Sequence, residues 1–447
     1  MSRDETAPSA PSPAPAGAAR RSDAAVQRRT MLVLAVAQVV GTIGVGIAPS
    51  IGVLLAGQVT DDEAWAGLAR TSSTLGAALL GLPLGTLAAR RGRRVALSTG
   101  WWIAAFGAGL LVVAAQWSEP FTLFLGLLAI GAGSAASLQS RFAATDLADP
   151  KHRGRSLALI VWVGTIGSVL GPNLGVPGEA VGRATGLTVF AAAFLIAAVC
   201  LALAGVLVLL LLRPDPLLRR QAAVAAACAA DPRAPVPDDR AASGAAEKPR
   251  RGDRVRRIFA EMRRNPTARL ALIGILTAQV VMVAVMTMTP VHISHEGGSL
   301  TLVGITISLH VVGMYALAPL VGIAADRLGA RSAMGFGVVV FAASLAIGAL
   351  RPGDMGWMMA SLILLGVGWS FVNVAGSALF STAVSESTRA ASQGGIDALA
   401  NLCGATAAFA AGPLLAATSF SVLSVVSAVL LVPFTALLIL STKGHRS

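Results

Sequence analysis

The sequence is poor in cysteine and in charged side chains. Its three cysteines, Cys200, Cys228 and Cys403, are scattered, with no spacing that suits a metal site or a disulfide framework. Charged residues make up 13% of the 447 residues, whereas soluble domains average roughly 25%. These shortages exclude a small disulfide-stapled protein and argue against a soluble globular one.

Acidic residues are also few: 22 stand against 35 lysines and arginines, which gives a formal net charge of +13. A charge of this size would indicate nucleic acid binding if the basic residues formed one face. They lie instead between long apolar runs, as in the loops that orient a membrane protein. We therefore expect a lipid bilayer, and no nucleic acid, as partner.

Hydrophobic residues account for 55% of the chain, in runs long enough to span a bilayer, which takes about 20 helical residues. The sequence predicts an all-α membrane protein with twelve transmembrane helices. The expected spans are 31–54, 66–88, 95–115, 121–144, 155–176, 186–212, 268–291, 300–324, 333–350, 356–383, 391–415 and 419–441.

The runs form two groups of six around a polar middle segment. The first 30 residues are rich in Ala, Pro and Ser and lack the apolar core of a signal peptide. We expect, in order, a disordered cytoplasmic tail (1–30), an N-terminal six-helix bundle (31–212), a basic cytoplasmic linker (213–267), a C-terminal six-helix bundle (268–441) and a cytoplasmic tail (442–447).

Lysines and arginines are concentrated in the loops on one side of these spans. The other side receives only Arg70, Arg183 and Arg351 at or near its surface. By the positive-inside rule, both termini are expected in the cytoplasm and the protein in the cell membrane.

A short polar segment occurs twice between consecutive apolar runs. Residues 85–94 read GTLAARRGRR and residues 322–331 read GIAADRLGAR, 237 positions later. Such a charged, glycine-marked segment fits a tight loop at a membrane face. Ala37–Val40 likewise recurs as Ala278–Val281, 241 positions later. The series indicates two homologous, pseudo-symmetric bundles.

The chain from about residue 31 to 441 resembles a twelve-span member of the major facilitator superfamily, whose loop motif is G-x-x-x-D-R-x-G-x-R. The second copy is complete at Gly322, Asp326, Arg327, Gly329 and Arg331. The first copy keeps Gly85, Arg90, Gly92 and Arg94 but has Ala89 where the family has aspartate.

The resemblance implies that this aspartate is a latch between the bundles that holds the outward-facing state. The Asp326 carboxylate can accept hydrogen bonds from N–H groups at a helix N-terminus, here that of the fifth span near Arg153. The alternative is that Asp326 only caps the next helix. Ala89 cannot accept a hydrogen bond, so the first loop is expected to contribute charge and close packing.

A second motif of the family lies in the fifth span, at Gly167, Gly171, Pro172 and Gly175, where small residues make a smooth face and proline adds a kink. The resemblance associates it with antiporters that export drugs, as part of a seam on which the halves rock. The alternative is ordinary helix packing. A third motif, Arg-x-x-Gln-Gly in the fourth span of drug exporters, is missing, since Leu127 and Ile130 stand before Gly131.

Ionisable side chains at membrane depth cost about 2.5–3.5 kcal/mol each on insertion scales and are therefore candidates for function. Asp397, His310, Arg141 and Asp146 are the proton-coupling candidates. Each has a structural alternative: Asp397 as a salt-bridge partner near the inner face, His310 bonded to a backbone carbonyl, and Arg141 paired with Asp146 at the gate.

Members of the family line the central cavity with their first, fourth, seventh and tenth helices. The resemblance therefore implies Gln38 and Gln279 as a pseudo-symmetric pair of substrate contacts, with Trp369 and Asn373 one turn apart on the tenth span. The alternative is that the two glutamines bond helix to helix across the seam.

A metal site is a competing interpretation of the seventh and eighth spans. Imidazole, carboxylate and thioether groups are plausible transition-metal ligands, although the histidine spacing is loose. The group comprises His292, His295, Glu296, Met282, Met286, Met288, His310 and Met314. An outer gate of hydrogen-bonded histidines is the favoured interpretation, and no metal is expected.

These observations predict a monomeric alternating-access transporter that exports small molecules, drugs or metabolites, in exchange for protons. The alternatives are uptake of a nutrient by symport and export of a metal or metal chelate. No nucleotide-binding loop or nucleophile–base pairing stands out, so we expect neither an enzyme nor a cofactor.

Overall fold

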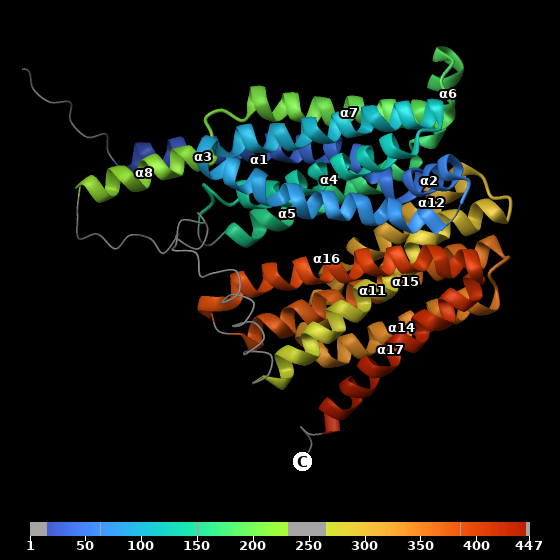
Figure 1. Ribbon diagram of the computed structural model, residues 1–447. Coiled ribbons are helices and arrows are strands. Elements are labelled where there is room, and N and C mark those ends of the chain that lie inside the picture. The colour runs from blue at the N-terminus through green and yellow to red at the C-terminus, as the bar shows by residue number, and fades with distance from the viewer. Residues whose placement is uncertain (1–15, 63, 150–151, 231–264, 385, 444–447) are drawn as a thin grey trace, which may run out of the picture.

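The computed structural model describes residues 16–62, 64–149, 152–230, 265–384 and 386–443. Within these ranges every regular element is a helix and there is no β-strand. The predicted all-α class is confirmed, and the apolar runs form long helices that lie roughly side by side (Figure 1).

The N-terminal half contains seven α-helices and two short helical turns. They are α1 (Ala16–Gly46), the π-helical turn η1 (Ala48–Gly52), α2 (Val53–Thr60), α3 (Ala64–Trp117), α4 (Pro120–Ala143), α5 (Arg153–Leu170), the 3₁₀ turn η2 (Gly171–Asn173), α6 (Gly175–Thr185) and α7 (Val189–Leu211).

After α7 the chain forms one further helix before the C-terminal half begins. The remaining helices are α8 (Pro216–Ala230), α11 (Pro266–His295), α12 (Leu300–Tyr315), α13 (Ala318–Leu328), α14 (Ala330–Leu350), α15 (Met355–Ala383), α16 (Glu386–Ala417) and α17 (Phe420–Lys443). Most of the segment predicted as a linker, residues 231–264, lies outside the described residues.

Eleven helical segments of the described residues are long and apolar enough to cross a membrane. One of them, α3, has 54 residues and contains a non-helical residue, Gly92, at φ 87° and ψ 170°. Because α3 turns at Gly92, its two arms account for two spans. The predicted count of twelve is thereby reached.

The two copies of the loop motif fold into the same turn. Gly329, between α13 and α14, has φ 86° and ψ 142°, close to the values at Gly92. A positive φ of this size is readily available only to glycine. The glycines that the motif places 237 positions apart are therefore required at the same point of each half.

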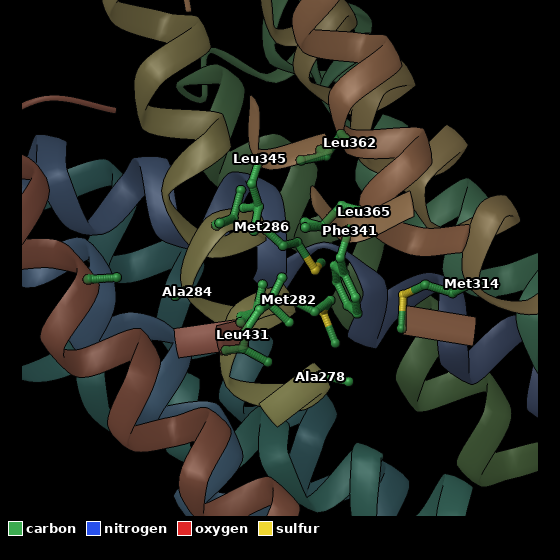
Figure 2. Close-up of a cluster of buried hydrophobic side chains, with 14 of the residues drawn as sticks. Ala278, Met282, Ala284, Met286, Met314, Phe341, Leu345, Leu362, Leu365 and Leu431 are labelled. Carbon is green, nitrogen blue, oxygen red and sulfur yellow. The ribbon is translucent and has the colours of Figure 1, made fainter. Parts of the chain in front are cut away.

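Each half buries its own hydrophobic core. Trp101 and Phe194 lie at the centre of the N-terminal core, and Phe341 and Phe434 belong to the C-terminal one. In Figure 1 the blue and green helices of the first half lie beside the yellow and red helices of the second. Figure 2 shows the second core around Phe341.

The structure departs from the predicted disordered tail, because α1 begins at Ala16. After Pro15 the sequence AGAARRSDAAVQRR contains no further proline and is rich in alanine and arginine, both good helix formers. Gln27 also donates a hydrogen bond to the carbonyl oxygen of Ala144, at 2.8 Å. This contact ties the start of the helix to the end of α4.

Candidate functional site

The two halves meet at one end of the bundle, through α3 and α16. A Cβ added to Gly67 would overlap the carbonyl oxygen of Ala408, and one added to Gly412 would overlap that of Ala64. Thr71 donates a hydrogen bond to the carbonyl oxygen of Ala405, at 2.9 Å. We call this end of the bundle, where residues 64–71 meet 405–412, the closed end.

A second contact between the halves joins η2 to α12 at the same end. Asn173 donates a hydrogen bond to Ser308 at 2.7 Å, and the Ser308 hydroxyl donates one to the carbonyl oxygen of Val169 at 2.6 Å. Gly304 lies against Pro172 and Asn173. Both contacts involve side chains that hydrogen-bond across the halves and small residues that let the backbones approach.

The opposite end carries the two turns at Gly92 and Gly329, and we call it the motif end. Asp326 and Arg327 are exposed there, as are Arg90 and Gly85. Gly85 and Gly322 have no atom within 4 Å of an added Cβ. In the described part of the chain Asp326 has neither hydrogen bond nor ion pair, so the contact predicted for a latch is not formed in this structure.

Of the other predicted latch residues, Arg331 and Arg94 are bound within their own halves. Arg331 donates a hydrogen bond to Thr267 at 3.3 Å, at the start of α11. The backbone N–H of Arg94 is bonded to Asp215 at 2.7 Å, just before α8. Arg153, at the start of α5, is partly exposed, with a buried Nε that has no hydrogen-bond acceptor.

Asp146 pairs with Arg93, and not with Arg141 as one sequence alternative had it. The Nε of Arg93 donates to an Asp146 oxygen at 2.9 Å, and the two side chains are only 10% and 4% exposed. Burial raises the pKa of Asp146 above its ordinary value, while the hydrogen bond from Arg93 acts in the opposite direction. Sequence distance hid this pair, because it joins the turn after Gly92 to the loop after α4.

A cluster of polar and aromatic side chains lies between the ends, on α11, α12 and α15. Trp369 donates its indole N–H to Gln279 at 3.0 Å. The rings of Trp369 and Tyr315 meet edge to face, with centroids 5.8 Å apart. Asn373 lies one helical turn beyond Trp369 and is also partly exposed. We call Gln279, Tyr315, Trp369 and Asn373 the aromatic cluster.

Two arginines of the other half are close enough to this cluster to interact with it electrostatically. Arg70 on α3 interacts with Tyr315 and His310, and Arg141 on α4 interacts with Tyr315 and Asp397. Neither guanidinium has an acidic oxygen within ion-pair distance among the described residues, and the Nε of Arg141 is buried without an acceptor.

Gln38 and His310 are also bonded within their own halves. Gln38 is 2% exposed and donates to Ser137 on α4, and it packs against Gly164 on α5. His310 is fully buried, with Nδ1 2.8 Å from the carbonyl oxygen of Leu362. The two glutamines have equivalent surroundings: Gln38 bonds to α4 and lies against Gly164, and Gln279 bonds to α15 and lies against Gly404, so each joins helices within its own half. They differ in the partner, which is Ser137 for Gln38 and Trp369 for Gln279.

Asp397 lies on α16 toward the motif end, where its carboxylate is exposed. It lines a pocket of about 150 Å³ together with Ile275, Ser377, Phe380 and Ile396. The pocket lies between α11, α15 and α16 of one half, while Arg141, with which Asp397 interacts electrostatically, belongs to the other. Asp397 therefore combines an exposed carboxylate with an electrostatic interaction between the halves.

The glycines of the fifth span pack mainly against α1 of the same half. An added Cβ on Gly171 would lie 2.6 Å from the carbonyl oxygen of Ile43, and one on Gly167 would overlap Thr42. Pro172 contacts Gly304, and Gly175 lies near Leu300, both in the other half. The motif thus combines ordinary packing along α5 with a contact between the halves at its end.

The residues of the proposed metal site do not converge. His292 stacks on Phe420 at a centroid distance of 4.5 Å, and its Nε2 is 2.7 Å from the carbonyl oxygen of Pro352. Met282, Met286 and Met314 lie in the core around Phe341 (Figure 2). No group of three or more His, Cys, Asp or Glu side chains suited to a metal occurs in the described ranges.

Sequence reasoning missed Arg70, Tyr315 and Arg93 as functional candidates. Arg70 was expected at or near the outer surface, and its position in the sequence gave no sign of its electrostatic interaction with Tyr315 and His310 on α12. Tyr315 is the single tyrosine of the chain and ends α12 at a break in the eighth span. A single tyrosine in the middle of an apolar span could have been recognised from the sequence as a candidate for substrate binding.

Comparison with known proteins adds a family model and several relatives. The model of the Major Facilitator Superfamily matches residues 34–299 and 270–447. The MFS-type transporter YdeG of Bacillus subtilis (strain 168) is 36% identical over 409 residues, covering 90% of this chain and 89% of YdeG. The riboflavin transporter RfnT of Brucella anthropi is 29% identical over 398 residues, covering 88% and 91%.

Two solved structures share the fold at low sequence identity. The nucleoside transporter NupG superposes with a TM-score of 0.67 at 16% identity, covering 92% of this chain and 98% of its own. A bacterial homologue of the human lysosomal transporter Spinster gives a TM-score of 0.65 at 15% identity, covering 94% and 97%.

Proposed function

Because this chain belongs to the major facilitator superfamily, whose members are membrane transporters, we propose that it exports a small molecule across the cytoplasmic membrane in exchange for protons. The family match supports transport itself. What we propose beyond the family match is export as the direction, protons as the coupling ion and the cytoplasmic membrane as the location. The observation that carries it is the closed end together with a latch contact that is not formed at the motif end.

Alternating access requires two states, each sealed at a different end of a fixed mid-membrane site. The positive-inside rule assigns the motif end, with its exposed Arg90, Arg91 and Arg327, to the cytoplasm. The described state is then inward-facing: α3 and α16 seal the outside, and Asp326 is unengaged. The outward-facing state forms when the α3–α16 contact opens and Asp326 approaches the start of α5.

Asp397 is the proposed proton carrier. Its exposed carboxylate belongs to the C-terminal half, and its electrostatic partner Arg141 to the N-terminal half. Closure of the motif end would bring these groups closer, and the guanidinium would then favour release of the proton. Protonation in one state and release in the other would couple proton movement to the rocking of the halves.

Proton exchange can be tested in proteoliposomes that contain pyranine, a pH-sensitive dye. Riboflavin is one test compound, because one relative is named a riboflavin transporter. 2-Naphthoate, an aromatic carboxylate, is the second, for the reason given in the next subsection. If a transported compound added outside is exchanged for protons, the lumen becomes alkaline. Lumenal acidification would indicate symport and uptake instead, and transport without any pH change would reject proton coupling.

Metal export is the weaker alternative, because His292 is bonded to a backbone carbonyl and the methionines lie in the core. A lumenal metal-sensitive dye in the same liposomes tests it with Zn²⁺ and Mn²⁺. Saturable entry of either ion, absent from empty liposomes, would restore the metal interpretation.

A further inference from the structure

We propose that the transported substrate is an aromatic anion, a planar ring system that carries a carboxylate or another acidic group. This inference rests on the proposed transport function and specifies the chemistry of the site between the two ends. The observations that carry it are the packed aromatic cluster of one half, the buried Nε of Arg141 without an acceptor, and the electrostatic interaction of Arg70 and Arg141 of the other half with Tyr315.

The first step is the charge. Arg70 and Arg141 lie in membrane-spanning helices and have no acidic oxygen within ion-pair distance in the described chain. Isolated arginines at membrane depth are costly, by about 2.5–3.5 kcal/mol on insertion scales. An anionic ligand would offset this cost by charge-assisted hydrogen bonds, for which the planar guanidinium has the matching geometry.

The second step is the position of Arg70. The neighbouring residue Thr71 is bonded to Ala405, and Gly67 packs on Ala408, so this turn of α3 is held firmly at the closed end. The side chain nevertheless interacts with Tyr315 and His310 on α12. Arg70 is thus a cation at the closed end, within electrostatic range of Tyr315 in the aromatic cluster.

The third step is the aromatic surface. Trp369 uses its only hydrogen-bond donor on Gln279, so the rest of its indole ring offers carbon surface. Tyr315 meets it edge to face, and both residues are partly exposed. Such a pair favours the offset or edge packing of a further aromatic ring.

The fourth step is the choice against other ligand classes. A cationic ligand at the aromatic cluster would be repelled by both guanidiniums, and the acidic Asp397 lies toward the motif end and interacts electrostatically with Arg141. A small inorganic anion would leave Tyr315 and Trp369 without a partner. Asn373 and the free N–H₂ of Gln279 add neutral donors that orient a ring substituent at little desolvation cost.

The test measures binding to the full-length chain in detergent by isothermal titration calorimetry. The probes are 2-naphthoate, its neutral isostere 2-naphthamide, the saturated decahydro-2-naphthoate and the cation 2-naphthylmethylammonium. We expect 2-naphthoate to bind at least roughly tenfold more tightly than each of the other three, as expected of a hydrogen-bonded ion pair and of an aromatic contact. Equal binding of the amide or the cation, or no binding of 2-naphthoate at millimolar concentration, overturns the inference.

Variants locate the contacts. Arg70→Gln should weaken 2-naphthoate binding roughly tenfold to a hundredfold, with Arg70→Lys in between because it keeps the charge and loses the fork. Trp369→Leu should reduce the preference for 2-naphthoate over its saturated analogue. Arg183→Gln, at an exposed site on α6, is the matched control and should bind as the wild type does.

The comparison of the four probes uses the wild-type protein, so it tests the inference even where a variant fails to fold. Failure of this inference can also be distinguished from failure of the transport proposal, because calorimetry measures binding and pyranine measures proton movement. Binding of 2-naphthoate without proton movement keeps this inference and rejects antiport. Proton exchange with riboflavin, together with no selectivity for the anion, keeps antiport and rejects this inference.

Discussion

At the scale of single residues, the Arg93–Asp146 pair is a buried ionic contact whose partners depend on each other. Replacing Arg93 by methionine removes the guanidinium and leaves a buried carboxylate, which costs about 3–5 kcal/mol in comparable pairs. We expect Arg93→Met to lower the melting temperature of the purified protein strongly. The double variant with Asp146→Leu should recover most of the loss, since no charge is then buried.

The same variant makes a prediction about pH. Burial already raises the pKa of Asp146, and loss of Arg93 should raise it further. A carboxyl whose pKa is higher in the folded than in the unfolded state contributes stability below the unfolded value and loses it as the pH rises. The defect of Arg93→Met should therefore be smaller at pH 5 than at pH 8. A defect independent of pH would mean that Arg93 acts through packing alone.

Asp397→Asn tests the proton carrier. The amide retains the shape of the side chain but cannot release a proton at neutral pH, so compound-induced alkalinisation of the lumen should be lost. Binding of 2-naphthoate should be retained, because the side chains proposed to hold it, Arg70, Arg141 and the aromatic cluster, are unchanged. Glu179→Gln, on the exposed part of α6, is the matched control, and full proton exchange by Asp397→Asn would remove this residue from the mechanism.

At the scale of elements, the contact between α3 and α16 determines whether the outside is sealed. Alanine at position 67 would place a methyl group on the carbonyl oxygen of Ala408, so the helices must separate. We expect Gly67→Ala to shift the protein toward the outward-facing state. Gly109→Ala, also on α3, is the control, because nothing lies within 4 Å of its added Cβ.

The shift can be measured by electron–electron resonance between spin labels at Glu179 and Glu296, which are exposed in different halves at the closed end. The labelled protein would have its native cysteines replaced by serine. A longer mean distance in Gly67→Ala than in Gly109→Ala is expected. An unchanged distance would show that the α3–α16 contact adapts without opening.

Element boundaries also show what the sequence could and could not reveal. The turns at Gly92 and Gly329 could be predicted, because a polar motif with glycines between two apolar runs must form a tight turn at the membrane surface. The helical start of α1 was not anticipated, since low hydrophobicity suggested disorder, whereas alanine and arginine favour helix once it is attached to a span. The run boundaries placed Arg70 near one end of its span, but they could not indicate its electrostatic interaction with Tyr315 and His310 on α12.

At the scale of the whole molecule, Asp326 is expected to bias the equilibrium between the two states. Asp326→Asn removes the charge that would interact with the N-terminus of α5, so the outward-facing state should lose about 0.3–1 kcal/mol. Spin labels at Arg91 and Ser332, at the motif end, should report a larger inward-facing fraction. Asp61→Asn at the closed end is the control, and equal populations in all three proteins would reject the latch.

The fold of the whole was predictable where the site was not. Few membrane architectures are compatible with twelve apolar runs, a duplicated loop and a basic middle segment. The site depends on pairs such as Trp369 with Gln279 and Arg93 with Asp146, which join distant elements and leave no spacing in the sequence. The duplication indicated which helices surround Gln38 and Gln279, but not that the bonded partner is Ser137 in one half and Trp369 in the other.

Asp215 gives the first half something that its loop motif lacks. One of its oxygens accepts the N–H of Arg94 at 2.7 Å, and the other accepts the N–H groups of Leu217 and Leu218 at 3.0 and 3.2 Å. Ala89 leaves the first loop motif without a carboxylate, and the segment that joins the two halves supplies one. The joint between the repeats is thus also a structural part of the first repeat. We therefore expect that two coexpressed fragments reassemble when the chain is divided after Ala230, because Asp215 then stays with the first half. Fragments divided before Asp215 should not reassemble.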